Sequence, residues 1–397
     1  MSCSGGAAAC GSRLLDFYSP YRLSTPQIHH LDMALRPNYK RYVLSIQYHG
    51  SAFLGFAYQG KDREDCILAD GTDLRGYVSV EGRLRQALDS MVTRDCYTNL
   101  QVSSRTDRGV HAIHNTLHVD LRDDVSIQDP HSIHRALNYF LGRHTYPHIY
   151  DDNDDESSSN ENPNNRLRRI DKATQVYRDG YWIPQYPPAN LRVLRVLPAP
   201  TTGLANPWGH AQYGQAATID WNARYSAIDR TYQYRILYGG HHDWAAPFEW
   251  DRALRIPQTT LDIPAMRQTA TDHFIGEHDY SSFRAARCQQ KSPLVHVRDV
   301  TLLDAPYSLW GTLTPPPASP SLRLLTIQIR ADSFVYRQVR NMVGCLLQVG
   351  RGALQPPDVR ELREARDRSQ ARYMMAPAHG LFLQHVRHQG IANSDLL

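Results

Sequence analysis

Runs of alternating apolar and polar residues, interleaved with helices that have one apolar stripe, recur in both halves of the sequence. In the first half, alternation predicts strands over residues 41–50 and 116–121, and the stripe in SVEGRLRQALDSMV, capped by Ser79, predicts a helix between them. In the second half, alternation predicts strands over residues 230–238 and 322–331. This pattern predicts an α+β fold of two similar halves, each with an antiparallel or mixed sheet covered by helices.

The most strongly patterned helix is predicted in SFVYRQVRNMVGCLLQVGRG, residues 333–352, where apolar side chains recur at helical spacing and Gly350 is expected to end the helix. Arg337 and Arg340 are three residues apart, so they share one face at the edge of the apolar stripe. From there they could hold a carboxylate in a cleft, although a solvated helix face explains them equally well. Shorter helices are expected over residues 130–141 and 264–276.

The segment YDDNDDESSSNEN, residues 150–162, carries six acids and no base, and it predicts a disordered insertion over residues 150–165. The 397-residue chain has a net charge of +4, so without these six acids the rest is +10. That charge favours a polyanionic partner, although ordinary surface charge is an alternative. We expect an N-terminal domain over residues 39–200, a C-terminal domain over residues 201–397 and a tail over residues 1–38.

The tail is rich in small residues and has two arginines, Arg13 and Arg22, against one acid, Asp16. It is too weakly apolar for a secretory signal. A mitochondrial transit peptide and a merely disordered tail fit its composition about equally. We therefore expect a mitochondrial protein, with a cytoplasmic or nuclear location as the alternative.

Signals for membranes, disulfides, metals and nucleotide cofactors are weak. No apolar run approaches the roughly 18 residues that a membrane span needs, so no membrane partner is expected. The six cysteines form no CxxC pair and the 19 histidines show no metal-binding spacing, so neither a disulfide framework nor a metal site is expected. No predicted strand leads into a glycine-rich phosphate loop, so no nucleotide cofactor is expected.

The loop SSRTDRGVHA, residues 103–112, places one acid between two arginines in a tight turn. Arg105 and Arg108 are expected to lower the pKa of Asp107 and so to keep it a carboxylate. That form suits a nucleophile or a base. The alternative is a surface turn in which Asp107 only forms a salt bridge.

Two tyrosines, Tyr232 and Tyr234, share one face of the strand predicted over residues 230–238. Tyrosines in such positions usually pack in the core. The functional alternative is a platform on which a nucleic-acid base stacks.

Five segments, in order and at consistent spacing from about Arg41 to Val386, resemble the TruA-type tRNA pseudouridine synthase family. The family's loop has the form GRTDxGVHA, and here it reads SSRTDRGVHA. The other four segments are NARYSAIDRTYQYRI, GEHDYSSFRA, SFVYRQVRNMVG and APAHGLFL. Variants within these motifs resemble the eukaryotic synthase-like 1 branch of the family, which is mitochondrial. The first loop departs from the family pattern, because His49 replaces an acid and Phe56 replaces a tryptophan.

The resemblance implies the pseudouridine synthase fold, with an active-site cleft between the two halves, and a homodimer. It implies that Asp107 is the catalytic nucleophile, which attacks a uridine so that the base detaches, rotates and reattaches through C5. It also implies that Arg340 pairs with Asp107. Four more side chains are implied to contact the nucleotide, by helping to extrude it or by packing on its base: Arg105, Tyr232, Leu381 and Leu383.

The function implied by the resemblance is an RNA pseudouridine synthase, an isomerase acting on tRNA or another structured RNA. Uridine and pseudouridine are isomers, so no cofactor is expected. The alternative is a catalytically weak RNA-binding or RNA-folding factor that retains the fold, and the presence of Asp107 disfavours it. An aspartate-dependent glycosidase or phosphotransferase is disfavoured because no partner carboxylate lies beside Asp107 in the sequence.

Overall fold

The computed structural model describes the chain over residues 35–57, 79–143, 175–178, 181–184, 190–200, 204–205, 218–239, 246–257, 260–286, 288–307 and 322–396. The acidic insertion expected over residues 150–165 and nearly all of the tail expected over residues 1–38 lie outside these residues. The domain boundary expected at residue 200 lies beside residues that are also outside them, so the domain division stays a prediction.

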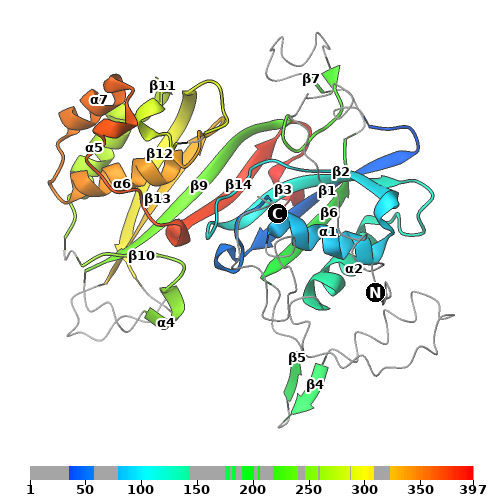
Figure 1. The fold of residues 1–397 in the computed structure, drawn as a ribbon. Helices are drawn as coiled ribbons and strands as arrows, with labels where there is room; N and C mark the ends of the chain where they lie inside the picture. The colour runs from blue at the N-terminus through cyan, green and yellow to red at the C-terminus, as the bar shows by residue number, and fades with distance from the viewer. Residues whose placement is uncertain are drawn as a thin grey trace, which may run out of the picture.

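Ten strands form one mixed sheet that runs through both halves of the chain (Figure 1). Its order is β11 (Gly276–Asp279), β12 (Leu294–Pro306), β13 (Arg323–Ala331), β9 (Ala227–Tyr238), β14 (Leu381–His388), β3 (His111–Arg122), β1 (Tyr39–Tyr48) and β6 (Leu191–Pro198). Two further strands join it at the side, β2 (Tyr97–Val102) against β3 and β10 (Leu254–Arg255) against β9. Two small sheets lie apart from it, formed by β4 (Gln175–Arg178) with β5 (Tyr181–Pro184) and by β7 (Leu204–Ala205) with β8 (Thr218–Ile219).

Strand β14, near the end of the sequence, lies in the middle of the sheet and joins the two halves. It pairs antiparallel with β9, where Leu383 lies opposite Tyr232. On its other side it pairs parallel with β3, where the same Leu383 lies opposite Ala112. The predicted α+β fold of two joined halves is therefore confirmed, and the meeting of the halves is built on this one strand.

Five longer helices cover the sheet: α1 (Val80–Met91), α2 (Pro130–Arg143), α5 (Ile263–His273), α6 (Gln338–Gly350) and α7 (Pro356–Ala365). Helices α1 and α2 lie against the N-terminal half, and α5, α6 and α7 lie against the C-terminal half (Figure 1). As predicted, Ser79 caps α1, and its side chain accepts a hydrogen bond from the backbone of Gly82 at 3.0 Å. None of the described helices is long and apolar enough to cross a membrane.

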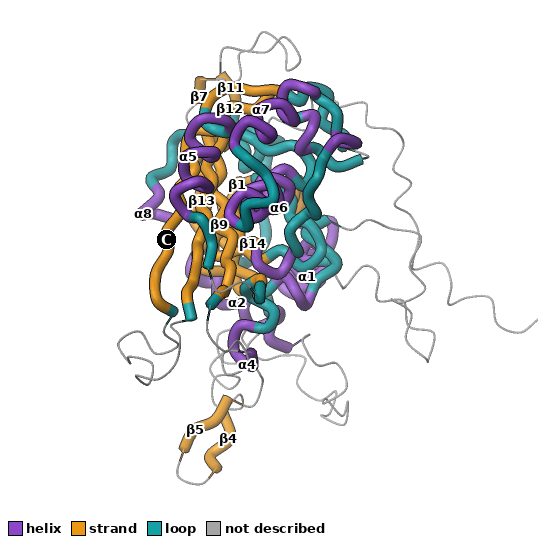
Figure 2. The backbone as a smooth tube through the Cα atoms, turned by 90° about the vertical axis from the view of Figure 1, so that its left-hand side faces the viewer, coloured by secondary structure: helices purple, strands orange, loops and turns teal. Residues whose placement is uncertain are grey.

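One cluster of buried side chains extends along the helix-covered face of the whole sheet, from Leu44 and Leu117 in the N-terminal half to Ile327 and Val343 in the C-terminal half. Figure 2 shows α1 and α6 on the same side of the layer of strands. A smaller cluster lies on the opposite face, where Val43, Trp221 and Ala223 pack with Leu396 of the short helix α8 (Asn393–Leu396). Because both faces are covered at β1, its alternation of apolar and polar residues is incomplete.

Helix α6 begins later than its apolar pattern predicts. The pattern starts near residue 333, but the helix begins at Gln338, and Arg337 before it has a left-handed backbone with φ of 61°. The side chain of Gln338 turns back and accepts a hydrogen bond from the backbone of Val335 at 2.9 Å, which fixes a tight turn in place of a first helical turn. Arg337 and Arg340 therefore do not share a helix face, which corrects the prediction from their spacing.

Gly344 on α6 has no side chain, which lets the backbone of Met374 pack closely against the helix. A Cβ added there would lie 2.1 Å from the carbonyl oxygen of Met374. We expect Gly344→Ala to lower the free energy of unfolding by roughly 1–3 kcal/mol, because it forces backbone apart in a packed region. Gly142→Ala on α2 is the matched control, because nothing lies within 4 Å of its added Cβ. It should be neutral or stabilise by up to about 1 kcal/mol. Equal effects of the two changes in chemical denaturation would show that the close contact at Gly344 does not limit stability.

Candidate active site

The loop that carries Asp107 connects β2 to β3 and is anchored by backbone hydrogen bonds at both ends. Ser103 donates to the carbonyl of Thr116 at 2.9 Å, and the backbone of Phe56 donates to the carbonyl of Thr106 at 3.0 Å. Gly109 has a φ of +79°, a left-handed conformation that a side chain would strain, and it lets the chain turn into β3. The loop is thus a fixed part of the structure.

A network of buried polar side chains holds the part of the loop that precedes Asp107. The Asn115 side chain donates to the carbonyl of Ser104 at 2.8 Å and to the Tyr48 hydroxyl at 3.2 Å. The Tyr48 hydroxyl is in turn 2.8 Å from the Thr106 hydroxyl, and the Ser104 hydroxyl is 2.8 Å from that of Tyr232. Ser104 and Thr106, which both precede Asp107, are therefore tied to β1, β3 and β9 at once.

Two arginines from the C-terminal half flank the Asp107 carboxylate. Arg340 Nη1 lies 3.6 Å and Arg337 Nε lies 3.7 Å from the same oxygen, Oδ2. Burial raises the pKa of Asp107, and the charges of Arg340 and Arg337 offset that rise only in part. The ion pair between Asp107 and Arg340 that the resemblance implies is present. It joins the N-terminal half to the C-terminal half.

The expected lowering of the Asp107 pKa by its loop neighbours is wrong. Arg105 and Arg108 both have exposed side chains, whereas the Asp107 side chain is only 23% exposed. Sequence spacing shows the two nearby charges but not the loss of water around the carboxylate. That loss is the largest influence on its pKa.

Arg340 is held rigidly by the segment that precedes β14. Its Nε donates to the carbonyl of Ala376 at 2.7 Å, and the backbone of Ala376 donates to the carbonyl of Arg340 at 3.1 Å. The residue is 9% exposed, and burial lowers the pKa of the guanidinium while Asp107 raises it. Arg340 is thus a fixed, nearly buried cation facing Asp107.

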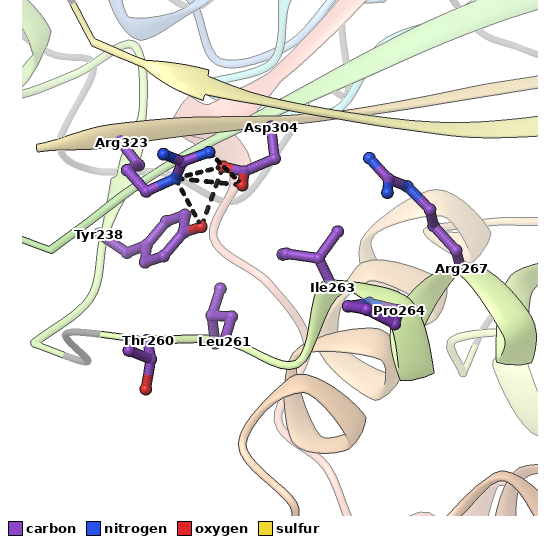
Figure 3. A pocket seen from close by; sticks show the side chains of 8 residues that line it. All are labelled: Tyr238, Thr260, Leu261, Ile263, Pro264, Arg267, Asp304 and Arg323. Atoms are coloured by element: carbon purple, nitrogen blue, oxygen red, sulfur yellow. Dashed lines mark hydrogen bonds and ion pairs between the residues drawn. The ribbon is translucent and has the colours of Figure 1, made fainter.

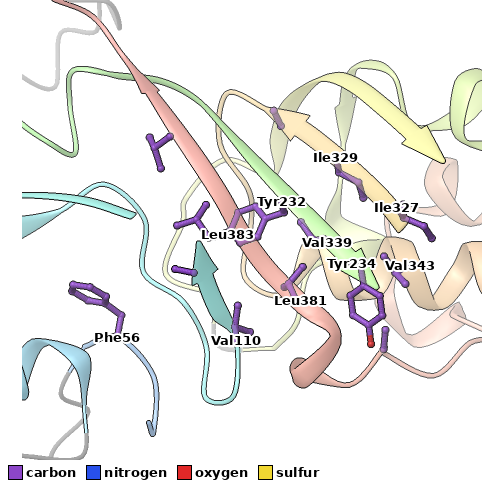
Figure 4. Close-up of a cluster of buried hydrophobic side chains, with 14 of the residues drawn as sticks. Phe56, Val110, Tyr232, Tyr234, Ile327, Ile329, Val339, Val343, Leu381 and Leu383 are labelled. Atoms are coloured by element: carbon purple, nitrogen blue, oxygen red, sulfur yellow. The ribbon is translucent and has the colours of Figure 1, made fainter. Parts of the chain in front are cut away.

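An apolar floor lies beside Asp107, formed by neighbouring side chains of β9 and β14. Figure 4 shows Tyr232, Leu381 and Leu383 together in this floor. Phe334 packs edge-on against Tyr232 with 5.2 Å between ring centroids. Tyr232 is 7% exposed, Leu381 5% and Leu383 0%, so all three side chains of the floor are buried. Burial raises the pKa of Tyr232 to about 12, which keeps its phenol neutral.

The structure thus brings together Asp107, Arg340 and Tyr232, with Leu381 and Leu383 behind them, and leaves Arg105 exposed on the loop. The roles of these residues toward a nucleotide stay predictions. Among the residues that the structure describes, no three side chains of metal-binding type gather at one point.

Sequence reasoning did not identify the residues that support the loop: Tyr48, Asn115 and Arg230. Arg230 is 8% exposed and donates to the carbonyl of Ser103 at 3.2 Å. A usable signal is present for Asn115, because it occupies the core-facing register of β3, opposite Ile46, where an apolar residue is expected. A polar side chain in such a position needs partners, and here they are in the loop.

His49, which departs from the family pattern, joins the two halves near the site. Its Nε2 lies 3.0 Å from Oδ2 of Asp251, and its ring lies 4.7 Å from that of His111. The backbone of Gly50 donates to Nδ1 of His111 at 3.0 Å, which leaves Nε2 to donate to the carbonyl of Asp251 at 2.9 Å. Burial, with a smaller effect of His49, lowers the pKa of His111 to about 4, so this imidazole is neutral.

A cavity of about 460 Å³ lies beside Tyr238 and Arg323 in the C-terminal half (Figure 3). Its charged lining is largely satisfied internally, since Arg323 Nη2 lies 2.6 Å from Oδ2 of Asp304 and the Tyr238 hydroxyl donates to Oδ1 at 2.9 Å. The cavity has no residue in common with the Asp107 loop.

Comparison with known proteins agrees with this site. The family model described as tRNA pseudouridine synthase matches residues 270–389. The human tRNA pseudouridine synthase-like 1 is 31% identical over 353 residues, covering 87% of this chain and 89% of that protein. The tRNA pseudouridine synthase A of Dinoroseobacter shibae is 30% identical over 350 residues, covering 88% and 96%. The mouse synthase-like 1 is 30% identical over 353 residues, covering 87% and 93%.

An α+β sheet of two joined halves, with an aspartate between arginines where they meet, is the arrangement that the resemblance implies. The chain belongs to the tRNA pseudouridine synthase family. The matched relatives include both synthase-like 1 proteins of mammals and synthase A proteins of bacteria.

Removing the Asn115 side chain should loosen the loop without unfolding the protein. In Asn115→Ala, we expect the amide hydrogens of residues 103–110 to exchange about tenfold faster, since each lost hydrogen bond contributes about 1 kcal/mol. Asn138→Ala is the matched control, because Asn138 bonds the backbone of Val193 at 2.8 and 2.9 Å far from the loop. Hydrogen-exchange mass spectrometry measures both variants. Unchanged exchange in the loop of Asn115→Ala would show that the network does not hold it.

Proposed function

We propose that this chain isomerises uridine to pseudouridine in tRNA, with Asp107 as the nucleophile. The observation that carries this proposal is the carboxylate of Asp107, flanked by Arg337 and Arg340 and lying beside the apolar floor at Tyr232. An anion held beside an aromatic surface is what an attack on a nucleotide with a planar base requires.

The reaction moves one bond of the base and conserves every atom. A carboxylate oxygen of Asp107 bonds to C1′ of the ribose as the bond from C1′ to N1 of the base breaks, and the base rotates. C5 then bonds to C1′ as the bond from C1′ to Asp107 breaks, which restores the carboxylate, and C5 loses its hydrogen while N1 gains one. The partial offset of burial by the two arginines maintains a population of ionised Asp107 for the attack. Tyr232, neutral because its pKa is about 12, would pack against the uracil once its buried ring is uncovered.

The target nucleotide has to leave the RNA stack, which costs a few kcal/mol. Arg105 is exposed on the same loop as Asp107, so its guanidinium can fill the place of the extruded base or contact a phosphate. On the neighbouring strand Leu383 lies opposite Tyr232 and Leu381 lies opposite Tyr234, so both leucines would pack behind the bound uracil. In this proposal the loop that carries Arg105 and Asp107 extrudes and attacks the nucleotide, and the apolar floor binds its base.

A catalytically weak RNA-binding factor is the rival function. It would need the same basic surface and floor, but it would not need a carboxylate that is partly buried against arginines. Burying such a group opposes its charged form. The retained Asp107 and its partners therefore favour the enzyme.

Asp107→Asn should abolish pseudouridine formation and leave RNA binding within about threefold of wild type, because it removes the nucleophile while keeping the shape of the side chain. The matched control is Asp123→Asn, which changes an exposed acid just after β3 and should leave activity unchanged. Chemical mapping of pseudouridine in a tRNA transcript measures the product, and filter binding measures affinity. Equal product from wild type and Asp107→Asn, or none from wild type while both bind, would refute the enzyme.

We propose in addition that the protein is a homodimer and that residues 1–38 direct it to mitochondria. Leu294 and Leu303 on β12 are 55% and 57% exposed, and a second copy would cover them. From residue 298 onward the outer edge of β12 has no strand partner among the described residues.

Arg13 and Arg22 in the tail support the proposed mitochondrial location. Sedimentation of the purified chain tests the first proposal, and organelle fractionation with and without residues 1–38 tests the second.

A further inference from the structure

We propose that Arg337 is a positioning residue of the reaction, which holds Oδ2 of Asp107 together with Arg340 and leaves Oδ1 to attack the uridine. This inference rests on the proposed function of Asp107. The resemblance to the family assigns a partner of Asp107 at Arg340 alone. The geometry of the turn before α6 assigns a second one.

The two arginines reach one carboxylate oxygen. Arg337 Nε and Arg340 Nη1 lie 3.7 and 3.6 Å from Oδ2 of Asp107. For each of the two arginines, the ion-pair contact with Asp107 is made to this oxygen. A carboxylate fixed through one oxygen has a defined orientation, and its other oxygen is free to form a bond.

The turn that carries Arg337 is built to present this side chain. Its backbone is left-handed, with φ of 61°, a conformation that an arginine adopts only when its surroundings impose it. The preceding residue is fixed from both sides. The backbone of Ala285 donates to the carbonyl of Tyr336 at 3.0 Å, and the backbone of Tyr336 donates to the sulfur of Cys288 at 3.4 Å. The guanidinium lies over the Tyr336 ring, 4.7 Å from its centroid.

Arg337 also has a buried donor without a partner. Its Nε is inaccessible to solvent and forms no hydrogen bond within the described residues, although the side chain as a whole is 37% exposed. Such a donor is costly unless a ligand or a small movement satisfies it. Oδ2 of Asp107 is the nearby acceptor, at 3.7 Å, and shortening that distance by a few tenths of an ångström completes a charge-assisted hydrogen bond when the nucleotide is bound.

Two cations act against the effect of burial on Asp107. Burial is the largest influence on Asp107 and raises its pKa, while Arg340 and then Arg337 lower it. Burial also lowers the pKa of Arg340. Burial raises the pKa of Tyr232 to about 12 and also raises the pKa of Tyr234, and it lowers the pKa of His379 beside Arg340. Removing Arg337 should therefore raise the pKa of Asp107 further.

The test is the pH profile of kcat/KM for pseudouridine formation in the full chain. In Arg337→Asn, which tolerates the left-handed backbone, the acid limb should move to higher pH. We expect kcat/KM to fall roughly tenfold or more at about pH 6 and to stay within about threefold of wild type at about pH 8.5. Arg337→Lys should restore most of the activity at the lower pH, because it restores the charge. KM for the RNA should change little in either variant.

Arg366→Asn is the matched control. Arg366 also has a left-handed backbone, with φ of 53°, and its Nε lies 3.6 Å from Oδ2 of an aspartate, Asp279, remote from the loop. Its pH profile should match wild type. A uniform loss at every pH in Arg337→Asn, or a rise in KM with an unmoved acid limb, overturns the inference and makes Arg337 a structural or a phosphate-binding residue. If wild type forms no pseudouridine at any pH, the proposed function itself fails.

Discussion

The partial burial of one carboxylate determines much of what surrounds it. Asp107 is mostly withdrawn from water, which raises its pKa and so opposes its charged form. The charged form persists only if cations are placed against it, and a loop has no means of supplying buried cations from its own few residues. The arginines within the loop are exposed, so the cations come from α6 and the turn before it. The site can therefore exist only where the two halves meet.

That meeting has to be accurate, and β14 provides the accuracy. The strand forms hydrogen bonds with β9 on one side and β3 on the other, so Leu383 has a fixed register against both Tyr232 and Ala112. A slip of one residue would turn the apolar floor to the opposite face of the sheet. The backbone leading into β14 also accepts the hydrogen bond of Arg340, through Ala376. One segment thus sets the position of the floor and of the cation.

Much of this could be predicted from the sequence where local pattern decides the outcome. Alternation located β1, β3, β9 and β13, and the cap at Ser79 located the start of α1, because these depend on residues a few positions apart. The start of α6 could not be found in this way. The side chain of Gln338 accepts a hydrogen bond from the backbone of Val335, and the helix therefore begins later than the apolar pattern does. The pKa of Asp107 was predicted in the wrong direction for a related reason. Charge is visible in a sequence, whereas the removal of water is a property of the assembled fold.

His49 stands where the family pattern has an acid. Its contacts show why this departure need not change the position of the catalytic carboxylate. His49 Nε2 lies 3.0 Å from Oδ2 of Asp251 in the C-terminal half, so this position contributes a polar contact between the halves. Asp251 also receives a hydrogen bond from His111 through its carbonyl, and this neutral histidine begins β3 immediately after the loop. The substitution therefore affects contacts at the start of β3, immediately after the loop. The position of Asp107 depends instead on Ser104 and Thr106, which are held by Asn115 and Tyr48. The first loop does reach the Asp107 loop, where the backbone of Phe56 donates to the carbonyl of Thr106 at 3.0 Å. Because that contact is made by backbone, the side chains of the first loop can change while the nucleophile keeps its place.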